Sequence, residues 1–205
     1  MKRIAYSGAM GEGLARVKDW LADHWVAGAG FMAAALLATA PLLGAEASLA
    51  LLLIFLHSPG YMIHQVEEHT GDRFRLFANH VVFGGREALT TPAVLVINVG
   101  AVWALNLGAL YAVLLCGPGY GLVAPYAMLV NGITHIGARV RLGVYNPGLV
   151  TSVALFLPLS LITIGAIGVE PEVGWRFHAA GLAGAVLLHL AIIAYVTLRL
   201  RRLRA

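Results

Sequence analysis

The sequence has very little cysteine and few charged side chains. Cys116 is the one cysteine in 205 residues, which excludes an intramolecular disulfide and a zinc cluster built on cysteines. Charged residues make up only 12% of the chain, whereas a soluble domain carries about 25%. Hydrophobic residues make up 60%. This composition excludes an ordinary soluble domain and is typical of a polytopic membrane protein.

The sequence also lacks internal repeats, linkers and low-complexity segments, so we expect one domain over residues 1–205. The first residues include several charges and no apolar core, which argues against a secretory signal. Residues 14–25 are instead expected to form an interfacial amphipathic helix that leads into the membrane. The net charge of +4 comes from tails and loops, which favours membrane lipids over nucleic acid as the partner.

Six apolar segments are close to the roughly 20 residues that a transmembrane helix requires. Helices satisfy their own backbone hydrogen bonds in lipid, so we predict an all-α polytopic membrane helix bundle. The six predicted spans are residues 26–43, 47–69, 92–116, 121–139, 149–168 and 177–198. A second interfacial helix is predicted over residues 73–89. With six spans, every Lys and Arg except Arg176 falls on one side, which predicts that both termini are cytoplasmic.

The segment from His64 to His69 places titratable side chains at the end of an apolar run. Such groups are costly in a bilayer and usually face a protein interior or a water-filled cavity. His64 and Glu68 share one face of a helix and Glu67 lies beside them, because residues three and four apart are neighbours. This stripe predicts a site rather than a solvated surface.

Two further polar elements are predicted to reach the same depth on the same side. Asn131 and His135 share one face near the cytoplasmic end of the fourth predicted span. Residues 145–148, Tyr-Asn-Pro-Gly, form a turn that enters the fifth span, because proline fixes φ and glycine permits a positive φ. Three elements that are distant in sequence therefore converge on one predicted site.

With these motifs the chain resembles the HXXEE family of small prokaryotic integral membrane proteins. The H-x-x-E-E motif of that family stands at residues 64–68, the N-x-x-x-H motif at residues 131–135 and the Y-x-P-G motif at residues 145–148. The resemblance implies a location in the prokaryotic cytoplasmic (inner) membrane. It supports one shared site and implies no particular reaction.

The residue types at this site favour a metal centre. His64, Glu68 and His135 form a two-His-one-carboxylate set, which suits Fe(II) or Zn²⁺ with open coordination positions. Further candidate ligands are Glu67, His69 and His80.

Three side chains are predicted to act on the substrate. Glu67 is the candidate general base. Asn131 is expected to orient a substrate carbonyl or a bound water, and Tyr145 to supply a proton.

A metal-free alternative is a buried His64–Glu68 ion pair that locks the second span against the fourth. The other histidines have simpler interpretations as hydrogen-bonded core residues (His57, His189) or interfacial residues (His24, His178).

Two classes of function fit this site. The first is a metal-dependent oxidoreductase or hydrolase that acts on a lipid, an isoprenoid or a lipidated peptide at the cytoplasmic leaflet. The histidine boxes of membrane fatty-acid desaturases are absent, and the E-E-x-x-x-R motif of the proteases that cleave prenylated proteins has Asp72 in place of arginine. The second class is a proton- or ion-coupled transporter. A structural membrane protein with a buried His–Glu pair is the third alternative.

Overall fold

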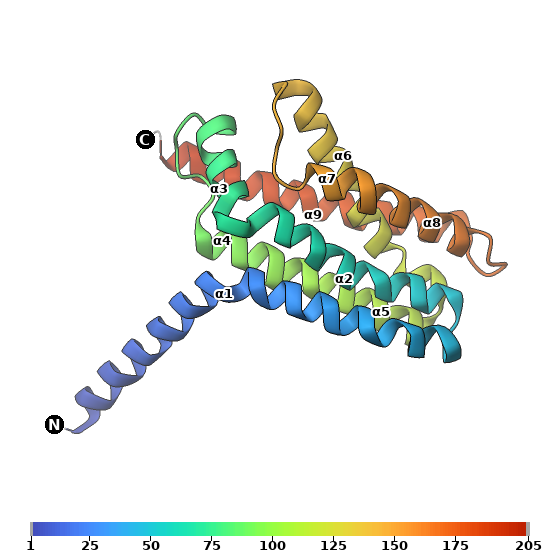
Figure 1. Ribbon diagram of the computed structural model, residues 1–205, viewed down its shortest axis with the longest axis horizontal. Helices are drawn as coiled ribbons and strands as arrows, with labels where there is room; N and C mark the ends of the chain where they lie inside the picture. The colour runs from blue at the N-terminus through green and yellow to red at the C-terminus, as the bar shows by residue number, and fades with distance from the viewer. Residues whose placement is uncertain (1, 204–205) are drawn as a thin grey trace.

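The computed structural model describes residues 2–203, and almost all of them are helical (Figure 1). The part of the chain that it describes contains no β-strand, which confirms the all-α prediction. Four long helices are α1 (Lys2–Glu46), α2 (Leu49–His69), α6 (Val123–Leu142) and α9 (Trp175–Arg202). A fifth runs through α4 (Thr91–Leu95), η3 (Val96–Trp103) and α5 (Ala104–Cys116). A sixth runs through α7 (Leu149–Thr151), η5 (Ser152–Phe156) and α8 (Leu157–Gly168).

The helix boundaries follow the local capping chemistry. The segment predicted over residues 149–168 begins and ends at the same residues in the structure. Helix α2 begins at Leu49 because the Ser48 hydroxyl accepts a hydrogen bond of 3.2 Å from the Leu51 N–H, which is the geometry of a helix N-cap.

The two helices predicted to lie at the interface differ from their predicted boundaries. The helix predicted over residues 14–25 is continuous with the first apolar segment as α1, and its residues 14, 15 and 18 lie outside the described side chains. The prediction for residues 73–89 was too long. After a short η1 (Thr70–Asp72), α3 (Arg73–Phe77) and η2 (Ala78–Val82) form a helix that ends at Val82, because Gly84 and Gly85 adopt positive φ angles.

Among the described residues, five helices are long and apolar enough to cross a membrane, which indicates an integral membrane protein. They are Asp19–Glu46, Leu49–Val82, Thr91–Cys116, Leu149–Gly168 and Trp175–Arg202. Helix α6 is less apolar, because Asn131, His135 and Arg139 interrupt its sequence.

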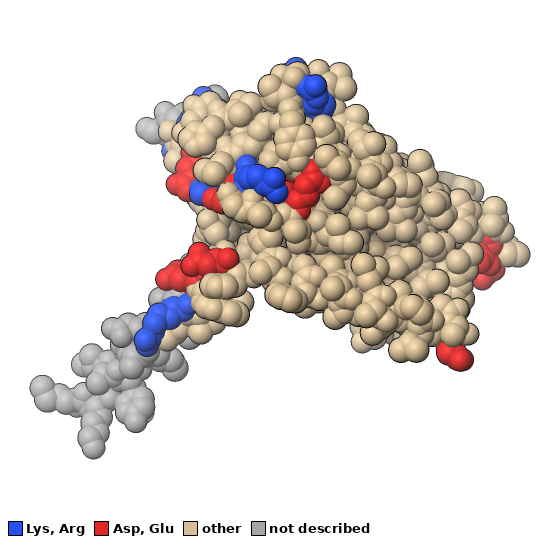
Figure 2. Space-filling view, viewed as in Figure 1, with Lys and Arg blue, Asp and Glu red and all other residues tan. Residues whose placement is uncertain are grey.

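The long helices lie side by side and alternate in direction (Figure 1). Helix α2 packs against α1, α5, α6 and α8 and is the most buried of the five apolar helices. At the end of the molecule where α8 turns into α9 and where α1 ends, the charged side chains visible on this face are acidic. The visible Lys and Arg lie toward the opposite end, together with further acidic side chains (Figure 2). An uncharged band separates the two ends, as expected for a protein that crosses a bilayer.

Close packing brings α6 and η5 together next to the polar motifs. A Cβ at Gly132 would lie 3.4 Å from the Phe156 side chain and 3.6 Å from the Ser152 carbonyl oxygen. A small residue is therefore suited to this contact, as in many membrane helix pairs. His135 lies three residues further along α6 and is held beside the start of the neighbouring helix.

Candidate metal centre

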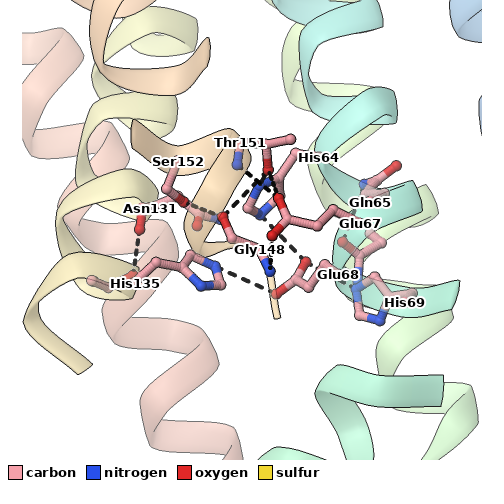
Figure 3. Close-up of polar contacts among 12 residues, drawn as sticks. His64, Gln65, Glu67, Glu68, His69, Asn131, His135, Gly148, Thr151 and Ser152 are labelled. Carbon is pink, nitrogen blue, oxygen red and sulfur yellow. Dashed lines mark hydrogen bonds and ion pairs between the residues drawn. The ribbon is translucent and has the colours of Figure 1, made fainter. Parts of the chain in front are cut away.

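The three sequence motifs meet at one place in the structure (Figure 3). The last two turns of α2 supply His64 and Glu68, and α6 supplies His135. The turn at residues 143–148 and the first turn of α7 close the third side. The fold therefore brings together the three motifs, as expected from the sequence.

The centre of the site is a carboxylate between two imidazoles. His64 Nε2 lies 3.5 Å from Glu68 Oε2, and His135 Nε2 lies 3.5 Å from Glu68 Oε1. One ligand atom from each of the three side chains lies within 4.8 Å of the others, and all three residues are buried. These three residues could hold one metal ion.

Each imidazole is held on its other nitrogen by a hydrogen-bond acceptor. His135 Nδ1 lies 2.7 Å from Asn146 Oδ1, and the Asn146 amide nitrogen donates to the His135 carbonyl oxygen at 3.0 Å. The second bond fixes which way the amide points, so His135 Nδ1 carries the proton and donates it. In the neutral imidazole His135 Nε2 then has a lone pair, which faces Glu68.

The same arrangement occurs at His64. His64 Nδ1 lies 2.7 Å from Thr151 Oγ1, and the Thr151 hydroxyl donates to Glu67 Oε2 at 2.5 Å. Because that hydroxyl donates its one proton to Glu67, it acts as the acceptor of a hydrogen bond from His64 Nδ1–H. Histidines that bind metals almost always donate their other ring N–H to such a partner. In their neutral forms both imidazoles therefore present Nε2 as an acceptor.

One of these acceptors is left without a partner. His64 Nε2 is buried and has no hydrogen bond to any of the described residues. An unpaired buried polar atom is costly and requires an explanation. A cation between the two Nε2 atoms and the Glu68 carboxylate would satisfy it, and two imidazoles with one carboxylate are a donor set for Fe(II) or Zn²⁺. The residues present fit a metal ion.

Glu67 faces away from the centre and binds the start of α7. Its carboxylate accepts hydrogen bonds from the backbone N–H groups of Gly148, Val150 and Thr151 at 3.2, 3.1 and 2.7 Å. The Tyr145 hydroxyl donates to Glu67 Oε1 at 2.6 Å. A negative charge at a helix N-terminus is stabilised by the unpaired N–H groups and by the helix dipole. Glu67 therefore ties α2 to the Y-x-P-G turn.

Tyr145 is bound to this carboxylate and is half exposed. Partial burial and the hydrogen bond to the negatively charged Glu67 raise the pKa of Tyr145 to about 12. The phenol therefore stays protonated at neutral pH.

Gly148 lies directly against the two imidazoles. A Cβ at this position would lie 2.7 Å from the Cε1 atoms of both His64 and His135, closer than real Cβ contacts. Its φ is +95°, which glycine adopts without strain. Glycine is required here on both counts, because it allows the backbone to close over the histidines.

Two other predicted ligands, His69 and His80, lie outside the group of three. His69 is buried, and its Nε2 lies 3.0 Å from Glu68 Oε2 without the geometry of a hydrogen bond. It lies outside the group of three that could share one ion. His80 is exposed on η2 and is also outside that group.

A cavity of about 440 Å³ reaches the site from the side of α9. Its walls are mainly apolar side chains from α3, η2, η3 and α9. Polar groups at its wall include Glu68, His69, Asn131, His135 and Asn146. Asn131 thus lies where the sequence placed it, beside His135 on a surface that a ligand can reach.

Two residues that bond to the imidazoles of the site were not predicted to do so. Asn146 was interpreted only as part of a turn, and Thr151 was not singled out. Asn146 occupies the variable position of the Y-x-P-G motif, and Thr151 lies three residues after its glycine. Neither position carries a sequence signal of its own, because their roles depend on the fold of the turn against α2 and α6.

The sequence profile of a protein family described as “Protein of unknown function with HXXEE motif” matches residues 55–163. This range contains all three motifs and every residue of the centre. No curated protein and no solved structure matches the chain.

Proposed function

This chain belongs to the HXXEE family, whose function is unknown, and we propose that it is a membrane-embedded metal-dependent enzyme that acts on a lipophilic substrate. The observation that carries this proposal is the pair of Nε2 acceptors that converge on Glu68 at the edge of an apolar cavity. A binding surface for lipid alone has no need of two imidazoles fixed in this tautomer.

We propose six transmembrane segments, with α6 as the fourth and both termini in the cytoplasm. Helix α6 is 20 residues long and packs against α8 and α9, which supports a place inside the bundle. The connections at residues 47–48, 117–122 and 169–174 contain no Lys or Arg. This asymmetry supports a prokaryotic inner-membrane orientation with the site at the cytoplasmic leaflet.

In the proposed centre His64, Glu68 and His135 hold a single Fe(II) or Zn²⁺ ion. A bound ion of this kind supplies a Lewis acid with open coordination positions. Thr151 and Asn146 hold the two imidazoles in the ligating tautomer. Glu67 and Tyr145 are positioning residues, since the Tyr145 hydroxyl donates to Glu67 and Glu67 also accepts from the backbone of the turn. Of the residues expected to contact the substrate, Asn131 is the one at the cavity wall.

The apolar cavity supports a lipid, an isoprenoid or a lipidated peptide as the substrate class. Phe74 and Phe77 of α3 and Ile192 and Val196 of α9 are among its lining side chains. Such walls exclude water, which strengthens electrostatic interactions at the reacting group. The proposed reaction is oxidation or hydrolysis at the end of the cavity that Glu68 and His135 reach.

The proposal is tested on protein purified in detergent, loaded with Fe(II) or Zn²⁺ and incubated with a bacterial membrane lipid extract. Mass spectrometry then searches for lipids that gain oxygen, lose hydrogen or are cleaved. We expect such products with the wild type and with His24→Ala, which changes an exposed histidine outside the group of three, and none with His135→Ala. Equal product formation by His135→Ala would refute the proposal.

A further inference from the structure

His189 in α9 is a polar side chain in the wall of the cavity that the proposed metal centre does not use. Its Nδ1 lies 2.8 Å from the Ala185 carbonyl oxygen, one turn earlier in the same helix. A carbonyl oxygen only accepts hydrogen bonds, so Nδ1 carries the proton. In the neutral imidazole Nε2 is then an acceptor.

This acceptor lies outside the metal centre. The three side chains that could share an ion do not include His189. Two other histidines, His24 and His57, make the same bond to a carbonyl four residues earlier, but neither lines the cavity. The intrahelical bond is therefore a common state of histidine in this protein, and the position in the cavity wall distinguishes His189.

A second polar group faces the same space from the neighbouring helix. Asn131 of α6 lines the cavity, and α6 packs against α9. Within the described residues its side-chain amide has no hydrogen bond, whereas the Asn146 amide is satisfied by His135. Polar groups that face an apolar cavity are costly unless a ligand or a water pairs with them. A site built to bond a substrate donor also rejects analogues that lack it.

We propose that His189 Nε2 accepts a hydrogen bond from the substrate, and that the substrate is a lipophile with a hydroxyl or amide N–H donor. This inference rests on the proposed function, because it concerns the ligand of the same cavity. The donor of the substrate lies between α9 and α6, where Asn131 binds the oxygen of the same group. The apolar remainder lies along the phenylalanines of α3 and the aliphatic side chains of α9.

Two photoreactive probes test this assignment: a long-chain alcohol with a diazirine in its chain, and its methyl ether, which has no donor. Labelling of the purified protein in nanodiscs is quantified by mass spectrometry of the peptides from α9 and α6. The experiment is run after chelation and in a His64→Ala background. The result therefore does not depend on the metal, and failure of the metal proposal is distinguishable from failure of this one.

We expect the alcohol to label these peptides about three- to tenfold more than the ether, the ratio that one hydrogen bond gives. His189→Phe should abolish the preference. His189→Gln, which keeps an acceptor, should retain it, and so should His24→Gln as the matched control. Equal labelling by alcohol and ether in the wild type would overturn the inference. So would a preference that survives in His189→Phe.

Discussion

Thr151 Oγ1 lies 2.7 Å from His64 Nδ1 and joins that imidazole to the Glu67 carboxylate. The first and fourth residues of the H-x-x-E-E motif are therefore connected through a side chain 84 residues further along the chain. The fifth, Glu68, faces the two imidazoles directly. The two adjacent carboxylates have different roles, because one anchors the turn and the other lies at the centre.

Thr151→Val is expected to weaken metal binding by about 10- to 100-fold, the usual effect of losing a partner behind a ligand. Valine keeps the shape of threonine but cannot accept from His64 Nδ1. Thr151→Ser keeps the hydroxyl and should bind metal like the wild type. The affinities are measured by competition with a chromophoric chelator. If valine and serine behave alike, the hydroxyl does not position His64.

Gly148→Ala should reduce metal binding, because its Cβ would displace both imidazoles. The matched control is Gly143→Ala. Gly143 also has a positive φ, of +71°, but a Cβ there meets nothing within 4 Å. Both variants should lose stability of about 1 kcal/mol or more from the backbone strain. Only Gly148→Ala should also lose metal, and retention of metal in this variant would contradict the geometry.

Glu67→Gln is expected to lower the free energy of unfolding by about 1–3 kcal/mol. The loss is measured as a lower melting temperature. A carboxylate accepts on both oxygens, whereas glutamine would turn an amide N–H group toward the donors of the turn. Glu46→Gln, at the far end of α1, serves as the control. An unchanged melting temperature with complete loss of activity would instead identify Glu67 as the general base.

The sequence was sufficient to predict the all-helical fold, because apolar runs indicate helices, although the helix predicted over residues 73–89 ends at Val82. It also predicted that His64, Glu68 and His135 converge, because i, i+4 spacing puts His64 and Glu68 on one helix face and the predicted topology puts His135 at the same end of the bundle. It assigned Glu68 to the metal and Glu67 to the role of general base, but it was not sufficient to predict that Glu67 rather than Glu68 binds the turn. They are adjacent on the helix, and only the position of the turn at residues 145–148 decides which one meets the N-terminus of α7. Asn146 and Thr151 were missed for the same reason. Their hydrogen-bond partners lie on other helices, and a local sequence pattern cannot predict such pairs.

The proposed orientation predicts which sites a membrane-impermeant thiol reagent can label. Single cysteines at positions 72 and 143, in a Cys116→Ser background, should react only after the cells are opened. Cysteines at positions 46 and 171 should react in intact cells. The reason is that Lys and Arg remain on the cytoplasmic side. Labelling of position 72 in intact cells would invert the proposed orientation.

The bound metal of the purified protein tests the central claim most directly. The protein is expressed in medium supplemented with iron, zinc and manganese, purified in mild detergent and analysed by inductively coupled plasma mass spectrometry. We predict about one equivalent of Fe or Zn in the wild type and in His24→Ala, since one ion fits the donor set. His64→Ala, Glu68→Ala and His135→Ala should each lose it while remaining monodisperse. A wild type free of transition metal, or a metal content unchanged in all three variants, would contradict the account.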